Sequence, residues 1–186
     1  LAGIKKLLTD LGHPERAYQI IHIAGTNGKG LTGAMLSHLL TQEGYRTGWY
    51  SSPHLEDIRE RIVINQQWID QQSFADHAQA VFKIVDSYQQ NPYISYFDLL
   101  TAVAFCAFRT AHVDWVVLET GLGGKADSTN VTDKALAVLT NIGYDHMHVL
   151  GNTLKEIAHE KLGILRPGVP VVLGAQKPEL FSWLCE

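Results

Sequence analysis

The sequence has few cysteines and no apolar run long enough to cross a membrane. Only two cysteines, Cys106 and Cys185, occur in 186 residues, which argues against a disulfide framework and against a cysteine-rich metal site. No apolar run reaches the roughly 18 residues that a transmembrane helix needs, and the first residues lack a signal-peptide pattern. We therefore expect a cytoplasmic protein with no membrane partner.

Basic residues are also scarce, and they form no dense block. The chain has 15 Lys and Arg against 19 Asp and Glu, a net charge of −4. Binding to a nucleic-acid backbone requires a basic surface, so nucleic acid is not an expected partner, whereas a small anionic substrate needs only a local cationic site. No NKxD sequence is present, which disfavours a GTPase. A monomer is expected.

Apolar strands alternate with helices through most of the chain, and the 46% hydrophobic content is enough for a real core. Polar or glycine-rich residues follow the strands. This order predicts the α/β class, with a mostly parallel sheet flanked by helices and a small β-hairpin insertion. The predicted helices cover 1–11, 31–43, 71–90, 97–110 and 153–162, and the predicted strands cover 17–24, 46–51, 61–65, 115–118, 135–140 and 169–173.

The same patterns predict three local details. The apolar face of helix 1–11 is expected to pack onto the sheet. Helix 71–90 is expected to turn Phe82 inward and to end at Asn91-Pro92. Residues 65–68 are expected to form the turn of the hairpin.

The stretch QIIHIAGTNGKGLTG, residues 19–33, has the order strand, glycine-rich loop, helix. Gly25, Gly28 and Gly30 lack the Cβ atoms that would keep a phosphate away from backbone N–H groups. A helix that begins near Lys29 directs its positive end at the same place. The loop therefore predicts a binding site for a nucleoside triphosphate.

The loop departs from the usual P-loop pattern, which asks for glycine six residues before the lysine and Ser or Thr directly after it. Ile23 and Gly30 occupy these positions. The hydroxyl group that normally binds Mg²⁺ must then come from elsewhere. The alternative interpretation is an ordinary glycine-rich turn between a strand and a helix.

Polar residues stand at the ends of three predicted strands: Ser51 and Ser52, Glu119, and Asp145 with His146. Glu119 directly follows the buried run WVVL, where an unpaired charge is costly, and Mg²⁺ is the simplest partner for it. A salt bridge or a contact to a helix N-terminus is the alternative for Glu119. His146 could instead be an ordinary hydrogen-bonded histidine.

The loop GLGGKADSTNV, residues 121–131, is glycine-rich and polar and can lie close to a ligand, although it could also be a long connection between strands. Together with five other blocks, it resembles the N-terminal ATPase domain of the folylpolyglutamate synthases, often bifunctional with dihydrofolate synthase, in the Mur ligase superfamily. SSPH, GLGGxxDxTNV and the glycine after the lysine favour the folate branch over the peptidoglycan branch. The blocks, in order, are AGTNGKG, SSPHLEDIRERIVIN, YFDLLTA, LETGLGGKADSTNV, NIGYDH and EIAHEKLGILRPGVPVV.

The resemblance assigns phosphate, metal and catalytic roles. It implies that the glycine-rich loop holds ATP, with Lys29 on the terminal phosphates. Ser52 would replace the missing loop hydroxyl as a Mg²⁺ ligand, Glu119 would bridge two magnesium ions, and His146 would bind the second ion. Lys161 matches a lysine that family members carbamylate to support that second ion. The loop residues in this assignment are Gly25, Thr26, Asn27, Gly28, Lys29 and Gly30.

The resemblance also assigns a substrate region. Four positions fall near the pteroyl group in bifunctional members, and Asn130 is assigned to the nucleotide site. Without the resemblance, Lys161 would be interpreted as a solvated helix lysine and Phe97 as a core aromatic residue. The four positions are Ser95, Phe97, Asp127 and Ser128.

Three positions depart from the family pattern. Leu31 stands where the family usually has Ser or Thr, Lys125 replaces an arginine, and Thr120 replaces an apolar residue. None of them removes a proposed metal ligand. Loss of one hydrogen bond at Leu31 would weaken phosphate binding by about 0.5–1.5 kcal/mol, and Thr32 could compensate.

The resemblance implies a P-loop NTPase-like Mur ligase central domain over residues 1–186, with the C-terminal glutamate-binding domain absent from this chain. The implied reaction is ATP-dependent addition of L-glutamate to folate or dihydropteroate through an acyl phosphate, and the isolated chain is expected to be inactive. A Mur-type ligase of cell-wall synthesis and a nucleotide-binding module without ligase activity are the alternatives.

Overall fold

The computed structural model describes residues 1–89 and 93–184 and contains one seven-stranded sheet in the order β4-β3-β2-β5-β1-β6-β7. The central and C-terminal strands pair in parallel, from β2 through β7 along this order. Strands β3 and β4 add an antiparallel hairpin at one edge. The strands are β1 Gln19–Ala24, β2 Thr47–Tyr50, β3 Ile62–Ile64, β4 Gln67–Trp68, β5 Trp115–Glu119, β6 Leu136–Leu139 and β7 Val171–Leu173.

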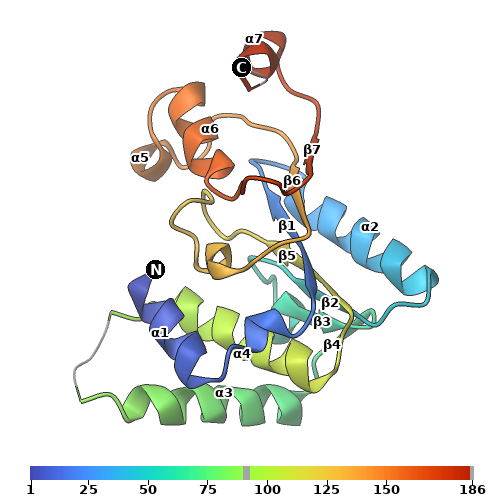
Figure 1. Cartoon of the computed structure of the whole chain (residues 1–186), viewed down its shortest axis with the longest axis vertical. Helices are drawn as coiled ribbons and strands as arrows, with labels where there is room; N and C mark the ends of the chain where they lie inside the picture. The colour runs from blue at the N-terminus through green and yellow to red at the C-terminus, as the bar shows by residue number, and fades with distance from the viewer. Residues whose placement is uncertain (90–92, 185–186) are drawn as a thin grey trace.

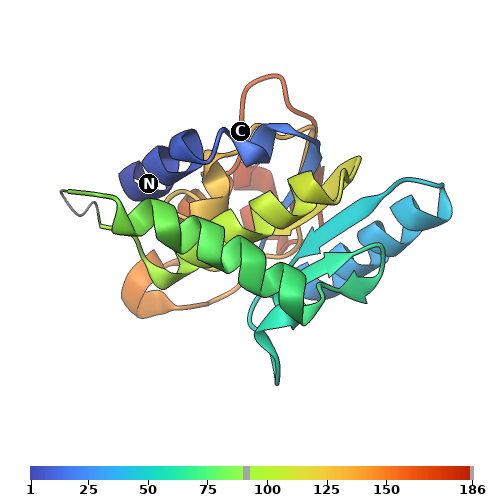
Figure 2. The ribbon, with the colours of Figure 1, turned by 90° about the horizontal axis from the view of Figure 1, so that it is seen from below.

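Helices lie on both faces of this sheet (Figures 1 and 2). The helix α2 covers one face, and α4 lies on the other face with α1 and α3 beside it. In the part of the chain that is described, no helix is long and apolar enough to cross a membrane. The helices are α1 Ala2–Asp10, α2 Lys29–Gln42, α3 Gln71–Asp86, α4 Tyr96–Thr110, α5 Met147–Leu150, α6 Leu154–Leu162 and α7 Pro178–Leu184, with short 3₁₀ helices η1 Pro14–Arg16, η2 Ile58–Arg61 and η3 Ser128–Val131.

The alternation of side chains along β1 separates two cores. Ile21 and Ile23 pack with Leu36 and Leu40 of α2 on one face of the sheet. Ile20 belongs to the larger core on the other face, which α4 fills because it is apolar nearly all round. The strand β1, which leads into the glycine-rich loop, is therefore held from both sides.

Gly48 of β2 lets α4 approach the sheet closely. A Cβ atom at Gly48 would lie 2.6 Å from the ring of Phe108, which is fully buried. The Phe108 ring also packs edge-on against Tyr18, with the ring centroids 6.1 Å apart. This contact fixes α4, whose first turn leads to the cavity described below.

Most predicted elements are confirmed within a few residues, and three details are wrong. The apolar face of α1 packs against α4, α3 and η3 rather than onto the sheet, because α4 occupies that side of the sheet. Phe82 is half exposed, since the buried stripe of α3 runs through Val81. The helix α3 ends at Asp86, before the predicted end at Asn91-Pro92, and Asn91 and Pro92 themselves lie outside the described residues.

The hairpin prediction is confirmed at its turn. Asn65 and Gln66 both have positive φ, 48° and 67°, as a tight two-residue hairpin turn requires. Gln67 and Trp68 belong to β4 rather than to the turn. The sequence did not predict the two short helices α5 and α7.

We expect Phe108→Ala to lower the free energy of unfolding by about 3–5 kcal/mol, the usual cost of deleting a fully buried phenyl ring. The same substitution at the half-exposed Phe82 is the matched control and should cost less than about 1 kcal/mol. Urea unfolding followed by circular dichroism measures both. Equal losses in the two variants would contradict this description of the core.

Candidate functional site

The carboxyl ends of β1, β2, β5 and β6 meet at one edge of the sheet because these strands run in parallel. The glycine-rich loop follows β1, Ser51 and Ser52 follow β2, and Glu119 ends β5. The segment that contains Asp145 and His146 follows β6. The structure therefore brings the predicted strand-end residues to one side of the molecule, where ligands bind in open α/β sheets.

Two glycines shape the loop after β1. Gly25 has φ +150°, and a Cβ atom there would lie 1.8 Å from the hydroxyl oxygen of Thr140. Gly28 has φ +83° and is the N-cap of α2, without a side-chain hydrogen bond in the described chain. The first N–H groups of α2 lack partners within the helix, so this end of α2 can meet an anion.

The segment after β6 braces the loop. The backbone N–H groups of Thr26 and Asn27 donate to the carbonyl and side-chain oxygens of Asn141, at 2.8 and 2.9 Å. The Thr140 hydroxyl donates to the carbonyl of Asn27 at 2.8 Å. The sequence patterns singled out only Asp145 and His146, further along this segment. They did not predict that Thr140 and Asn141 hold the backbone of the glycine-rich loop in place.

Lys29 extends over the loop from the first turn of α2. Its Nζ donates to the carbonyl oxygens of Gly25 and Thr26, at 3.1 and 3.3 Å. The same Nζ lies 3.9 Å from Oε1 of Glu119, beyond hydrogen-bond length. The ammonium group thus lies between the loop and the carboxylate at the end of β5.

Glu119 has a buried carboxylate with one unpartnered oxygen. Its side chain is 4% exposed, and Oε2 has no hydrogen-bond partner in the described residues. Burial raises the pKa of Glu119 to about 7, although Lys29 and the backbone N–H of Ser52 act in the opposite direction. A Cβ atom at Gly30 would lie 3.7 Å from Oε2. The salt-bridge alternative therefore leaves Oε2 unexplained, and a cation beside the loop would satisfy it.

Lys161 is buried, with 1% of its surface exposed, so the interpretation as a solvated lysine is wrong. Its Nζ donates to the carbonyl of Gly25 at 2.9 Å and to Oδ2 of Asp145 at 3.2 Å. Burial lowers the pKa of Lys161, while Asp145 raises it. His146 is half exposed and has Nε2 3.4 Å from Oδ1 of Asp145. Lys161 thus links the glycine-rich loop to Asp145, which lies next to the predicted metal ligand His146.

The donor atoms fit Mg²⁺ held together with phosphate oxygens. In residues 1–89 and 93–184, no group of three or more His, Cys, Asp or Glu is arranged to hold a metal by itself. Mg²⁺ in nucleotide sites is commonly bound through one or two carboxylates and the phosphates of the substrate. The unpartnered oxygen of Glu119 meets this requirement, and Ser52 and His146 both line the cavity described next.

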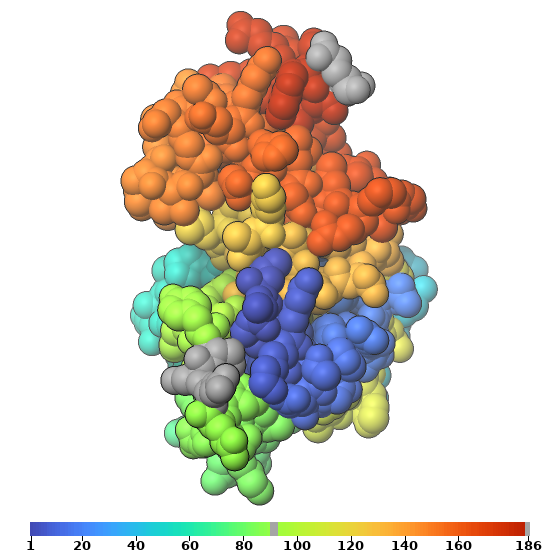
Figure 3. All heavy atoms as spheres, turned by 60° about the vertical axis from the view of Figure 1, so that its left-hand side comes forward, coloured from blue at the N-terminus to red at the C-terminus, as the bar shows by residue number. Residues whose placement is uncertain are grey.

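A cavity of about 700 Å³ lies beside these groups. Phe97 forms part of its wall and also packs on the core, with its ring centroid 5.9 Å from that of Tyr50. In Figure 3 the segment near residues 120–130, in yellow, lies between the part of the chain after residue 140 and the N-terminal part. The cavity is lined by Ser52, Pro53, Arg61, Phe97, Gly121, Leu122, Ala126, Asp127, Ser128, His146, Val149, Leu150 and Glu160.

Asp127 and Ser128 line the cavity, whereas Ser95 does not. Ser95 is the N-cap of α4 and forms a capping box with Asp98. Ser128 donates to Oδ1 of that same Asp98 at 2.6 Å. The position of Ser95 thus supports the cavity wall, and a direct contact of Ser95 with a substrate stays a prediction.

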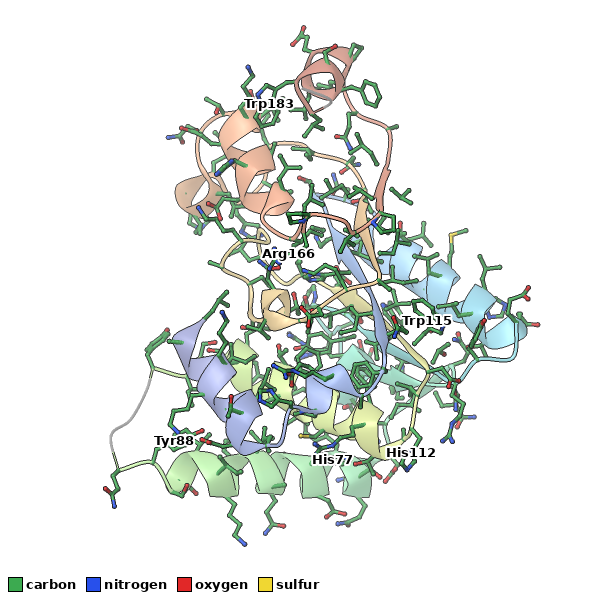
Figure 4. The ribbon with its side chains drawn as sticks, viewed as in Figure 1. His77, Tyr88, His112, Trp115, Arg166 and Trp183 are labelled. Carbon is green, nitrogen blue, oxygen red and sulfur yellow. The ribbon has the colours of Figure 1, made fainter. Side chains whose placement is uncertain are left out.

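Asn130 has its amide hydrogen bonds inside the fold. Its Nδ2 donates to the carbonyls of Lys125 and Gly163, at 3.1 and 2.9 Å. Its Oδ1 accepts from Lys134 and from Arg166, which Figure 4 labels near the centre of the molecule. The structure gives Asn130 a supporting role, and its predicted contact with the nucleotide stays untested.

Sequence reasoning missed two charged residues of the cavity, Arg61 and Glu160. The Nε of Arg61 donates to Nδ1 of His54 at 2.8 Å, which holds the guanidinium group in place. The mixed-charge run LEDIRERIVIN was a signal for Arg61, but its position at the cavity follows only from the hairpin. Two of the positions that depart from the family pattern can also be placed: Leu31 is 70% exposed on α2, and Thr120 is buried.

Comparison with known proteins gives a consistent result. Residues 23–177 match the model of the Mur ligase middle domain. A dihydrofolate synthase/folylpolyglutamate synthase of Bacillus subtilis is 42% identical over 182 residues, which is 96% of this chain and 42% of that protein. The chain thus spans about two fifths of the length of this relative.

Solved structures agree with this result. A Mycobacterium tuberculosis folylpolyglutamate synthase complexed with ADP and AMPPCP has a TM-score of 0.91 and 39% identity, covering 99% of this chain and 43% of that one. An FPGS–AMPPCP–folate complex has a TM-score of 0.92 and 35% identity, covering 98% of this chain and 45% of that one.

The raised pKa of Glu119 predicts a specific dependence of stability on pH. Between pH 4.5 and about 7 the unfolded state loses this proton while the folded state keeps it, so the carboxyl group destabilises the fold increasingly as pH rises. Without nucleotide or metal, Glu119→Gln should therefore be more stable than the parent at pH 8, by on the order of 3 kcal/mol, and nearly equal to it at pH 4.5.

Chemical denaturation in the presence of a chelator, at several pH values, measures this difference. Glu43→Gln, the same substitution at an exposed glutamate away from the site, is the control. A difference between the parent and Glu119→Gln that does not grow with pH would contradict the assignment of a strained, buried carboxylate.

Proposed function

The chain belongs to the Mur ligase family through its middle domain, and from this premise we propose that it binds ATP and Mg²⁺ in a ligase that adds L-glutamate to folate or dihydropteroate. The observation that carries the proposal is the position of Glu119. Its unpartnered carboxylate oxygen lies beside Gly30 of the glycine-rich loop, and Ser52, whose backbone N–H donates to this carboxylate, lines the cavity together with Asp127 and Ser128.

The loop is suited to a triphosphate. The N–H groups at the start of α2 would donate to phosphate oxygens, and Lys29 would leave the carbonyls of Gly25 and Thr26 to meet the terminal phosphate. Glu119 and Ser52 would hold Mg²⁺ against the phosphates, with His146 as a ligand for a second ion. When bound, Mg²⁺ neutralises the charge that moves between phosphate oxygens during transfer.

The cavity is suited to a flat aromatic substrate with a carboxylate. Phe97 would stack on the ring, and Arg61 supplies a positive charge at the same opening. A carboxylate oxygen of the substrate would attack the terminal phosphorus of ATP, which releases ADP and forms an acyl phosphate. The amino group of L-glutamate would then attack the carbonyl carbon, which gives the amide, inorganic phosphate and a proton. No protein nucleophile is required.

Lys161 has a place in this scheme. Burial lowers its pKa and so favours the neutral amine, the form that adds carbon dioxide to give a carbamate and a proton. A carbamate there would turn a cation into an anion beside Asp145 and His146, which would support a second magnesium ion. We propose this modification as part of the same site.

The glutamate site is proposed to lie in a part of the longer relatives that this chain does not match, since those relatives are more than twice its length. A further domain would also close over the acyl phosphate and exclude water from it. We further propose a cytoplasmic, monomeric enzyme that binds small molecules rather than nucleic acid or membranes.

The catalytic assignment predicts that Lys29→Ala and Glu119→Gln lower ATP-dependent glutamate incorporation by orders of magnitude in the full-length protein, because each removes a charge that the transferring phosphate needs. His146→Ala should be milder. Incorporation of radiolabelled glutamate into folate and into dihydropteroate measures turnover, with UDP-linked cell-wall precursors as the rival substrates.

The control for this experiment is Lys83→Ala, which removes an exposed lysine of α3 that does not line the cavity. Excess Mg²⁺ should not restore glutamate incorporation by the Glu119→Gln variant. Turnover of Lys29→Ala at the parent rate would refute the phosphate-loop assignment. Activity on UDP-linked precursors but not on folate or dihydropteroate would show that the enzyme is a ligase of cell-wall synthesis.

The domain assignment predicts that the 186-residue chain alone binds ATP weakly and incorporates no glutamate. Adding a separately produced C-terminal portion of the full-length protein should restore incorporation. Calorimetry with an ATP analogue and the radiolabel assay measure the two effects. Substantial ligation by the 186 residues alone would show that the glutamate site lies within them.

A further inference from the structure

His22 is a fully buried polar side chain in the middle of β1, and no step proposed above uses it. Its neighbours Ile21 and Ile23 pack toward α2, so His22 faces the opposite side of the sheet. There its Nε2 lies 2.8 Å from the hydroxyl of Thr129, and its Nδ1 lies 3.1 Å from Nζ of Lys134. Both ring nitrogens therefore have a partner from the segment after β5.

The direction of these hydrogen bonds is set from the Asp127 end. A carboxylate can only accept, so the Thr129 hydroxyl donates to Oδ1 of Asp127 at 2.5 Å, and Nε2 of His22 carries the proton and donates to Thr129. Nδ1 of the neutral ring then accepts from Nζ of Lys134, whose pKa burial lowers to about 7. Burial lowers the pKa of His22 well below its usual value, which agrees with a neutral ring.

The last acceptor in this series, Asp127, holds the wall of the cavity together. Asp127 accepts from the backbone N–H of Thr129 through Oδ1 and from that of Leu122 through Oδ2, at 3.0 and 2.9 Å. The backbone N–H groups at the two ends of the segment 122–129 therefore donate to the same carboxylate. Asp127 and Leu122 both line the cavity, whereas His22 does not.

We propose that His22 is a positioning residue for the substrate of this cavity: through Thr129 it orients the carboxylate of Asp127 and the segment 122–129. This inference rests on the proposed function, in which the cavity takes the pteroyl group. Because His22 acts on the cavity wall and not on the brace of the phosphate loop, its loss should affect the pteroyl substrate far more than ATP.

The test compares four forms of the full-length protein. His22→Leu alone would leave the buried amino group of Lys134 without one of its acceptors and could unfold the protein. The decisive variant is therefore His22→Leu combined with Lys134→Met, and its reference is Lys134→Met alone. His22→Gln combined with Lys134→Met tests rescue, because the glutamine amide nitrogen can reach the position of Nε2. Thermal unfolding checks that each form is folded.

Steady-state kinetics should show a KM for the pteroyl substrate that is about tenfold higher in the double variant than in Lys134→Met, the scale of one lost buried hydrogen bond. The KM for ATP should stay within about twofold, and His22→Gln combined with Lys134→Met should stay close to Lys134→Met in both KM values. An unchanged pteroyl KM in the folded double variant, or an equal rise of both KM values, would overturn the proposal.

A second measurement is independent of activity. Nitrogen NMR of the parent protein with isotope-labelled histidine should show one buried neutral imidazole protonated at Nε2, which the variant His22→Gln with Lys134→Met lacks. Protonation at Nδ1 would overturn the hydrogen-bond series whatever the kinetics show. A parent that carries the Nε2 proton but ligates no folate or dihydropteroate would refute the proposed function while leaving the series itself intact.

Discussion

The buried, half-satisfied carboxylate of Glu119 is the constraint on which this edge of the sheet depends. A charge at the end of a buried strand destabilises a fold unless it gains a partner, and here Lys29 approaches without forming a hydrogen bond. The cost is tolerated because β5 lies at the centre of the sheet, where its neighbours β1 and β2 hold it on both sides. Stability in the core thus supports an unfavourable charge, which either a proton or a bound cation can neutralise.

Sequence patterns predicted the sheet and the strand-end residues because both follow from local chemistry. An apolar run followed by Glu119 or by Gly25 places that residue at a strand end whatever its neighbours are. Order along the chain does not give order across the sheet, however. Strand β5 lies between β1 and β2, and this insertion brings Glu119 next to Lys29. Long-range pairing of this kind has no local signal.

Burial was the second property that the sequence did not provide. From the sequence, Lys161 is interpreted as a solvated helix residue. In the structure, however, it is buried and donates to the carbonyl of Gly25 and to the carboxylate of Asp145. His22 is similar, since a single polar residue in an apolar strand can be an exposed or a buried one. Only the neighbouring segment, with Thr129 and Lys134, decides which it is.

The brace from β6 to the phosphate loop has a consequence for the entropy of binding. Asn141 and Thr140 hold the backbone of Thr26 and Asn27 through hydrogen bonds that exist without any ligand. The conformational freedom of this loop is therefore lost when the chain folds and not when a ligand arrives. An anion that enters meets N–H groups already in place, so ordering this part of the backbone is not a cost of its binding, whereas its desolvation and its own loss of motion still are.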